Sequence, residues 1–197
     1  MHANALTTSG PASRFEIETP RLRLREMGAG DIDFVAAMLA DPDVTKFYEH
    51  RYSRRECEMW IARQVERYRR DGHGLWLAVE RTAAIPVGQI GLVMQDIDGV
   101  AHAEVGWLLH RPYWGVGYAT EAAAAVRDAA FRHWQYDHVV SLIRHDNLRS
   151  RRVAERLGFT PGRVVPFRER DHIVYEGWPR DAGAAGQPAA DGGRSHG

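Results

Sequence analysis

Hydrophobic and polar positions along the chain follow two different periods, and these periods predict its secondary structure. Residues 21–26 carry a leucine at every second position, which is the period of a half-buried strand. Residues 31–40 and 53–72 instead repeat apolar residues every three or four positions, as helices do. Asp31 has the place of an N-cap, and Ser53 with Glu56 has the spacing of a capping box. The second helix therefore has an apolar stripe formed by Trp60, Ile61, Gln64, Val65 and Tyr68.

The remainder of the chain alternates between strands and helices. We predict strands at residues 75–80, 87–94 and 101–109, a helix at 119–134, a strand at 138–143, a helix at 147–157, and two short strands ending near Tyr175. Consecutive strands in the middle imply hairpins, whereas the later strand–helix–strand order implies a parallel crossover. The sequence thus predicts an α/β fold with a mixed central sheet of about six to seven strands, flanked by four helices.

Composition limits where this domain works and what it binds. Residues 1–13 and 181–197 are rich in small and polar side chains, so we expect them to be disordered and residues 14–180 to form one domain. The 26 basic and 26 acidic residues balance, which favours neither nucleic acid nor a membrane surface as partner. There is no signal-peptide layout and no apolar run of about 20 residues, so we expect a cytoplasmic protein.

The same inventory gives no sign of metal or disulfide chemistry. Cys57 is the only cysteine, which excludes an internal disulfide framework. The histidines have no metal-ligand spacing, so we predict no metal site. We interpret the many arginines of the helix at 53–72 as its solvated face.

The stretch between the strand at 101–109 and the following alanine-rich helix is typical of a phosphate-binding loop. Gly115 and Gly117 permit a positive φ and a close approach of the backbone to a ligand. Backbone N–H groups at a helix start, together with the helix dipole, attract phosphate. No Lys-Ser/Thr pair follows, and Thr120 stands where a dinucleotide fingerprint has its third glycine. A glycine turn without a ligand remains open on this segment alone.

A second segment, residues 147–159, gives the loop a context. Asn147 has an N-cap position and Gly158 a C-cap position. Together the two segments resemble the GNAT superfamily of acyl-CoA N-acyltransferases over roughly residues 15–178. The opening Glu-Thr-Pro-Arg-Leu-Arg-Leu-Arg at 18–25 and Tyr-Ala-Thr-Glu-Ala at 118–122 are most similar to its Rim-type branch of ribosomal-protein N-terminal acetyltransferases. The family signature falls on Trp114, Gly117 and Ala119, where tryptophan departs from the usual Gln or Arg.

The resemblance implies a GNAT fold that uses acetyl-CoA as cosubstrate, without a metal. The acceptor would be a primary amine of a small molecule or a protein N-terminus, and the enzyme is compatible with a homodimer. By resemblance, the residues that contact CoA are Trp107, Leu108, Leu109, Trp114, Gly115, Val116, Gly117, Tyr118, Ala119, Thr120, Asn147 and Arg151.

Two residues are candidates for the chemistry. Glu104 lies on the strand that feeds the loop, where relatives often carry a general base, although an exposed strand carboxylate is the plainer interpretation. It shares a face with Gly106, which suggests a bulge or a close approach of substrate. Many relatives use a Tyr as acid at the position of Ala154, so Ser150, which matches the second family motif, is the available substitute. Two alternatives remain open: Ser150 only caps and packs, or the thiolate leaves without a dedicated acid.

The acceptor side is less defined. Phe47 and Tyr48, between the first two helices, are candidate substrate contacts together with Glu104, although helix packing explains them equally well. Asp41, Asp43 and Glu49 would either attract a cationic amine or serve only to solvate their loop, and the sequence favours neither interpretation. Two alternatives remain: a catalytically silent CoA-binding sensor or partner module, and an enzyme that uses a longer acyl-CoA.

Overall fold

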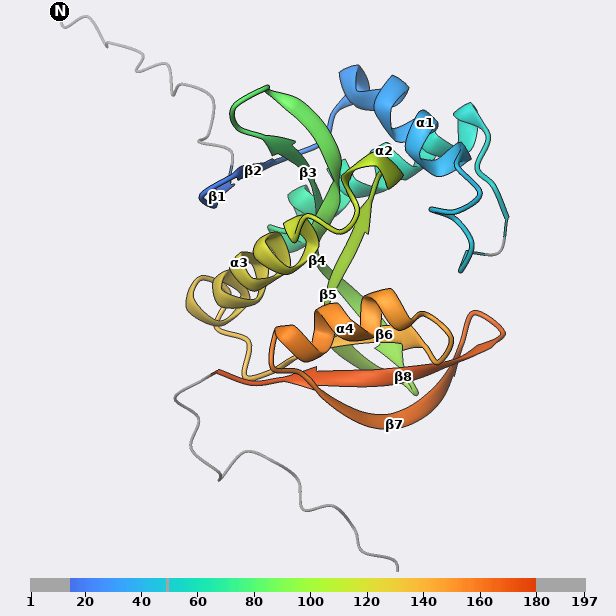
Figure 1. Ribbon diagram of the computed structural model, residues 1–197. Helices are drawn as coiled ribbons and strands as arrows, with labels where there is room; N and C mark the ends of the chain where they lie inside the picture. Colours follow the sequence, from blue (N-terminus) through green and yellow to red (C-terminus); the bar gives the residue numbers. More distant parts are fainter. Residues whose placement is uncertain (1–14, 49, 180–197) are drawn as a thin grey trace, which may run out of the picture.

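The computed structural model describes residues 15–48 and 50–179, which share one mixed sheet (Figure 1). The predicted disordered ends, 1–13 and 181–197, lie outside these residues. The strands are β1 (Ile17–Glu18), β2 (Leu22–Arg25), β3 (Leu75–Glu80), β4 (Ile85–Ile97), β5 (Val100–Leu109), β6 (Val139–Arg144), β7 (Thr160–Phe167) and β8 (Arg170–Gly177). The helices are α1 (Ile32–Ala40), α2 (Arg54–Asp71), α3 (Tyr118–Arg132) and α4 (Leu148–Arg156), with short 3-10 turns at Ala29–Asp31 and Arg111–Tyr113.

The sheet has the order β1-β2-β3-β4-β5-β6-β8-β7. Its only parallel pair among the described residues is β5 with β6, across the α3 crossover, so the predicted mixed α/β architecture is confirmed. The sheet has eight strands, however, and not six to seven. The additional strand, β1, pairs Ile17 with Leu24 over two residues only, and two residues contain no period that a pattern can detect.

Helix starts and faces follow the sequence closely. Glu56 N donates to Ser53 Oγ over 3.3 Å and Ser53 N donates to Glu56 Oε2 over 2.7 Å, so the capping box of α2 is confirmed. Asp31 stands at the N-cap of α1, but its carboxylate accepts instead from Gly28 N and pairs with Arg25 at 2.7 Å. Val65 is 48% exposed and does not belong to the buried stripe, because it is turned about 100° from Gln64 around the helix.

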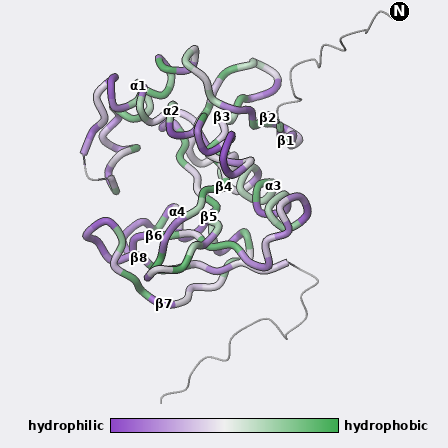
Figure 2. Tube along the Cα trace, turned by 180° about the vertical axis from the view of Figure 1, so that it is seen from behind, coloured by the Kyte–Doolittle hydropathy of each residue, from purple (hydrophilic) through white to green (hydrophobic). Residues whose placement is uncertain are grey.

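The core lies on both faces of the sheet. Alternate residues of β3 divide between two clusters: Trp76 and Ala78 pack with α3, whereas Leu77 and Val79 pack with α1 and α2. A third, small cluster joins Ile97 to β6, β7 and β8. Hydrophobic positions are concentrated along the central strands, while α4 is largely hydrophilic (Figure 2). No helix in the described part of the chain has the length and apolar character needed to cross a membrane.

Strands β5 and β6 pair only at Glu104 and Val140 and then diverge. Near this point Ser141 Oγ donates to Val105 O over 2.7 Å. A side-chain hydrogen bond therefore stands where backbone pairing between β5 and β6 would continue. The residues of β5 beyond Glu104 pair with β4 on one side and face an opening on the other. The β4–β5 register is continuous through the Gly91–Gly106 pair, so the bulge suggested at Gly106 is not found in this ladder.

Candidate active site

The loop after β5 leads directly into α3 through two left-handed glycines. Gly115 has φ 82° and Gly117, the N-cap of α3, has φ 89°. A Cβ built at Gly115 would meet no atom within 4 Å, so it is backbone conformation rather than crowding that favours glycine there. Helix geometry leaves the first N–H groups of the 15-residue α3 without carbonyl partners. The loop therefore presents backbone donors and the positive end of a helix dipole.

Arg21, in the turn between β1 and β2, holds this loop from outside. Its Nη1 donates to Val116 O over 2.9 Å and its Nε to Glu121 Oε2 over 2.6 Å. Its guanidinium also lies 4.7 Å from the ring centre of Tyr118. The Glu121 carboxylate accepts in addition from Thr19 Oγ1 and Arg21 N. These contacts join residues 18–25 to residues 118–122, the two segments that resemble the Rim-type branch. The sequence pattern does not predict the contacts, because the partners are 100 residues apart in the chain.

Trp114 connects the loop to its surroundings. Its Nε1 donates to Leu109 O over 2.8 Å, and the Arg149 guanidinium lies 4.4 Å from its ring centre. The start of α4 is thereby fixed beside the loop. Asn147 Oδ1 accepts from Ser150 N over 3.2 Å, so its predicted N-cap role is confirmed.

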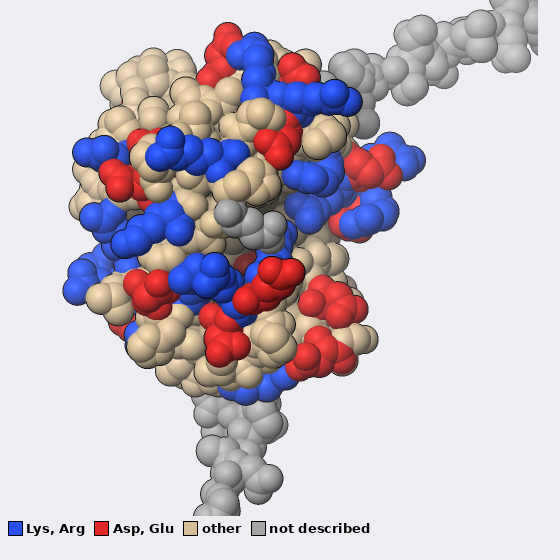
Figure 3. Space-filling model, turned by 90° about the vertical axis from the view of Figure 1, so that its right-hand side faces the viewer, with Lys and Arg blue, Asp and Glu red and all other residues tan. Residues whose placement is uncertain are grey.

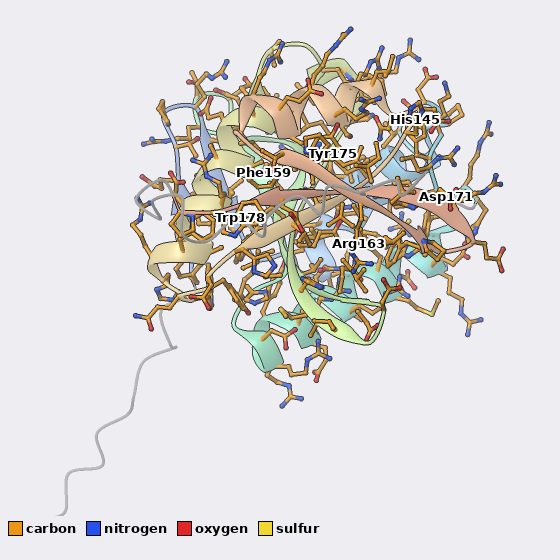
Figure 4. The ribbon with its side chains drawn as sticks, turned by 90° about the horizontal axis from the view of Figure 1, so that it is seen from below. His145, Phe159, Arg163, Asp171, Tyr175 and Trp178 are labelled. Atoms are coloured by element: carbon orange, nitrogen blue, oxygen red, sulfur yellow. The ribbon has the colours of Figure 1, made fainter. Side chains whose placement is uncertain are left out.

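Arg151, a predicted CoA contact, has partners within the protein. Its Nε donates to the hydroxyl of Tyr175 over 3.0 Å and its Nη1 to His145 O over 3.2 Å. Tyr175 belongs to β8, and His145 lies in the loop between β6 and α4; Figure 4 labels both residues. This guanidinium is therefore an internal tie between α4 and β8.

A cavity of about 740 Å³ opens beside the donor loop. It lies between α2 with its preceding loop, strands β4 to β6, and the β7–β8 hairpin. The cavity brings together seven of the predicted site residues: Phe47, Tyr48, Glu104, Trp107, Leu108, Asn147 and Ser150. The other predicted contacts, Leu109, residues 114–120 and Arg151, do not line it. The sequence-predicted residues thus fall into two adjacent regions: a backbone loop and a cavity lined by side chains.

Glu104 lies at the inner end of the cavity, where β5 and β6 separate. Its Oε2 accepts from Gln95 Nε2 over 2.8 Å and its Oε1 from Leu142 N over 3.3 Å. Burial raises the pKa of the Glu104 carboxyl, and these two hydrogen bonds oppose that rise only in part. The group is therefore not an exposed strand carboxylate. A carboxylate with a raised pKa, inside a cavity, is suited to accept a proton.

The cavity wall is rich in arginine. Five arginines line it, against three glutamates: Arg63, Arg67, Arg144, Arg168 and Arg170 against Glu56, Glu104 and Glu169. The interpretation of the α2 arginines as solvated face is therefore wrong for Arg67, which is half-buried, whereas Arg63 lines the cavity but is exposed. On the face shown in Figure 3, Lys and Arg side chains are interspersed with Asp and Glu.

Asp41 and Asp43, two of the acidic residues named for the acceptor, do not line the cavity. Asp43 pairs with Arg111 at 2.9 Å, and Asp41 Oδ1 accepts from Asp43 N. Glu49 lies outside the described residues. Asp41 therefore stabilises the conformation of its own loop, and Asp43 forms an ion pair.

An aromatic wall completes the cavity. The ring centres of Tyr48 and Tyr52 lie 6.0 Å apart, and that of Trp60 lies 5.6 Å from Tyr52. Burial raises the pKa of Tyr48, so its hydroxyl stays protonated. Sequence reasoning missed the polar residues of the floor, Gln89 and Gln95. The only indication in the sequence was that both are polar residues in a largely apolar strand, at positions that face the cavity.

Comparison with known proteins agrees with this arrangement. The family model described as "Acetyltransferase (GNAT) domain" matches residues 21–160, a span that includes both the loop and Glu104. The chain belongs to the GNAT acetyltransferase family. This GNAT protein is 32% identical to "Uncharacterized protein YkkB" of Bacillus subtilis (strain 168) over 165 residues, which are 83% of this chain and 96% of that one.

Solved structures share the fold of this GNAT protein. An acetyltransferase from Agrobacterium tumefaciens str. C58 has a TM-score of 0.74 and 28% identity, with 90% of this chain and 100% of that chain covered. The ribosomal L7/L12 alpha-N-protein acetyltransferase RimL, solved in complex with coenzyme A, has a TM-score of 0.69 and 17% identity over 83% and 98% of the two chains. Within the part that the structure describes, no group of three or more His, Cys, Asp or Glu side chains is arranged to hold a metal ion.

Proposed function

We propose that this GNAT protein transfers an acetyl group from acetyl-CoA directly to a primary amine, with Glu104 as the general base. The observation that carries the proposal is the position of Glu104: a half-buried carboxylate with a raised pKa, at the point in the cavity where β5 leaves β6. A base at this place reaches an amine held in the cavity and a thioester held along β5.

The donor side fits a pyrophosphate and an extended arm. The loop at 115–117 and the first turn of α3 offer N–H groups to phosphate, since a Cβ at Gly115 meets nothing within 4 Å. The free edge of β5 at Trp107 to Leu109 offers backbone groups to the arm, although Leu109 O already accepts from Trp114. RimL, a protein of this fold, was crystallised with coenzyme A, and this supports the same donor here.

When bound, acetyl-CoA supplies a thioester carbonyl that is open to attack. Glu104 accepts a proton from the substrate ammonium, and the neutral amine then forms the C–N bond. Backbone N–H groups of Trp107 to Leu109 stabilise negative charge on the carbonyl oxygen. As the C–S bond breaks, the second proton lost from nitrogen ends on the sulfur, and the Ser150 hydroxyl in the cavity is the group assigned to pass it. Ala154 is buried and has no such group.

The test is release of free thiol from acetyl-CoA across a panel of primary amines that includes peptides with free N-termini. We expect at least one amine to accelerate release, and Glu104→Gln to remove this acceleration without weakening CoA binding in calorimetry. If CoA binds tightly, no amine accelerates release and Glu104→Gln changes nothing, the protein is a CoA-binding module instead. Acetyl-, propionyl- and succinyl-CoA in the same assay test the alternative of a longer acyl group. Preference for peptides would support the Rim-type branch.

A further inference from the structure

One polar atom of the cavity has no partner within the protein. Gln89 is 1% exposed and lines the cavity, yet its Nε2 is the one buried side-chain N or O atom, among those that the structure describes, without a hydrogen bond. The orientation of this amide is fixed, because Trp60 Nε1 can only donate and does so to Gln89 Oε1 over 2.9 Å. The free side of the amide is therefore a donor. A buried amide donor without a partner is costly unless a ligand satisfies it.

Arg67 supplies positive charge to the same cavity. It lines the cavity, and its Nη1 donates to Gln64 Oε1 over 3.3 Å, a long bond to an oxygen that also accepts from Leu75 N. Within residues 15–48 and 50–179, no carboxylate lies within ion-pair distance of Arg67, whereas Arg63 stands one turn before it on α2. Burial, and after it the charges of Arg63 and Arg70, lower the pKa of Arg67, and the more distant carboxylates of Asp71 and Glu104 oppose this only in part.

We propose that Gln89 Nε2 and Arg67 bind a carboxylate of the acceptor, so that the amine acetylated beside Glu104 belongs to an amino acid. An amide N–H and a guanidinium are both donors, and the planar fork of a guanidinium matches a carboxylate. This inference rests on the proposed function and adds the acceptor class to it.

The register of the sheet fixes how far apart the two ends of the acceptor lie. Gln89 is opposite Leu108 and Val93 is opposite Glu104, so four residues of β5 separate the carboxylate end from the base, or on the order of 13 Å between Cα atoms. Glu104, Gly106 and Leu108 share the cavity face, and long side chains from both ends shorten the gap. Gly106 leaves space between them, because a Cβ there would meet only Leu75 Cδ2, at 3.6 Å. The gap that remains between the ends of these side chains sets the length of the amino acid that can bind.

The test compares acids with their amides. Thiol release from acetyl-CoA is measured with ω-amino acids of two to six carbons and with the twenty α-amino acids, each beside its carboxamide, and with O-phosphoethanolamine. We expect the best acid to exceed its carboxamide at least tenfold in kcat/KM, mainly through KM. Gln89→Glu has the same shape and still accepts from Trp60, but it offers a carboxylate where the amide donated. This variant should raise the KM of the acid at least tenfold and leave that of the carboxamide nearly unchanged.

Arg67→Gln should act in the same direction. The matched control is Arg69→Gln on the same helix, because Arg69 is exposed and pairs with Glu66 at 2.7 Å outside the cavity. It should leave the ratio of acid to carboxamide unchanged. Melting curves establish that each variant is folded, and Arg67→Gln carries the test if Gln89→Glu does not fold.

Several results would overturn the inference while the proposed function stands: carboxamides equal to acids, O-phosphoethanolamine above every carboxylate, or variants that slow acid and carboxamide equally. If no amine is acetylated, the proposed function fails. The carboxylate site is then tested separately, by measuring ligand binding. Calorimetry in the presence of CoA compares N-acetylglycine with N-acetylglycinamide. Stronger binding of the acid that is lost in Gln89→Glu supports the site, and equal binding of both contradicts it.

Discussion

The donor loop and the acceptor cavity lie side by side but are built in opposite ways. The loop, residues 114–120, is one continuous segment whose proposed ligand groups are backbone N–H groups, and Arg21 and Glu121 hold its shape. The cavity draws side chains from α2, three neighbouring strands and the β7–β8 hairpin. A backbone site tolerates changes of side chain as long as its glycines remain, whereas the cavity can change its ligand with one substitution. This difference suits a fixed donor and an adaptable acceptor.

The largest expected effect separates the chemistry of the cavity from the binding of the donor. Glu104→Gln should lower kcat by about 10²- to 10³-fold, the range typical for loss of a general base, while the affinity for CoA stays within about twofold. Stopped assays and calorimetry give the two numbers. A loss of CoA affinity equal to the loss of rate would show that the two regions are not separable.

The same variant has a pH signature. Because the pKa of Glu104 is raised, the base becomes protonated as pH falls through that value, and kcat/KM should fall with it. Glu104→Gln should lose this acidic limb. A carboxyl whose pKa is higher in the folded state stabilises the fold below its unfolded pKa of about 4.3, and this contribution is lost as pH rises through the folded value. At pH 7 the variant should therefore melt no lower than the native protein.

The second prediction breaks the donor loop and leaves the cavity intact. Gly117→Val places a β-branched side chain at φ 89° and should weaken CoA binding by about 30-fold or more, because the N–H groups of the α3 start lose their arrangement. Gly99→Val is the matched control, since Gly99 has φ 80° in the β4–β5 turn and a Cβ there meets nothing within 4 Å. Both variants should lose similar stability, but only the first should lose CoA affinity. Equal CoA affinities would count against the loop as the donor site.

A smaller effect tests whether the loop needs its brace. Arg21→Met removes the hydrogen bonds to Val116 and Glu121 and should raise the KM for acetyl-CoA by about three- to tenfold, with kcat nearly unchanged. The loss of stability should stay below about 1 kcal/mol, because the Arg21 side chain is 46% exposed and solvent screens the ion pair. Arg23→Met, on the exposed face of β2, is the control. Arg21→Met and Arg23→Met with the same KM would mean that the brace is only structural.

The two regions also differ in how much of them the sequence predicts. The loop and Asn147 were predictable, since glycine positions and an N-cap are local properties. Glu104 was predictable as a candidate because the family resemblance marks its strand. Gln89 and Arg67 were not, because Arg67 occurs on a helix rich in arginine, and only the packing of α2 over β4 decides which arginine meets the cavity. The sequence suggests Arg151 as a CoA contact. Its hydrogen bond to Tyr175 could not be predicted, because it depends on where a strand 24 residues further along the chain packs.

Ser150 is where the loop, the cavity and α4 meet, and it should give the smallest effect. Its backbone N–H donates to Oδ1 of Asn147, the N-cap of α4, and the residue lines the cavity. Because a thiol has a pKa of about 8.5, thiolate leaves readily near neutral pH without an acid, so Ser150→Ala should lower kcat by no more than about tenfold. The cap comes from Asn147 and is retained, so the melting temperature should hardly change. If Ser150→Ala loses as much rate as Glu104→Gln, proton delivery to sulfur limits the reaction and the acid is essential. If it loses none, water protonates the thiolate.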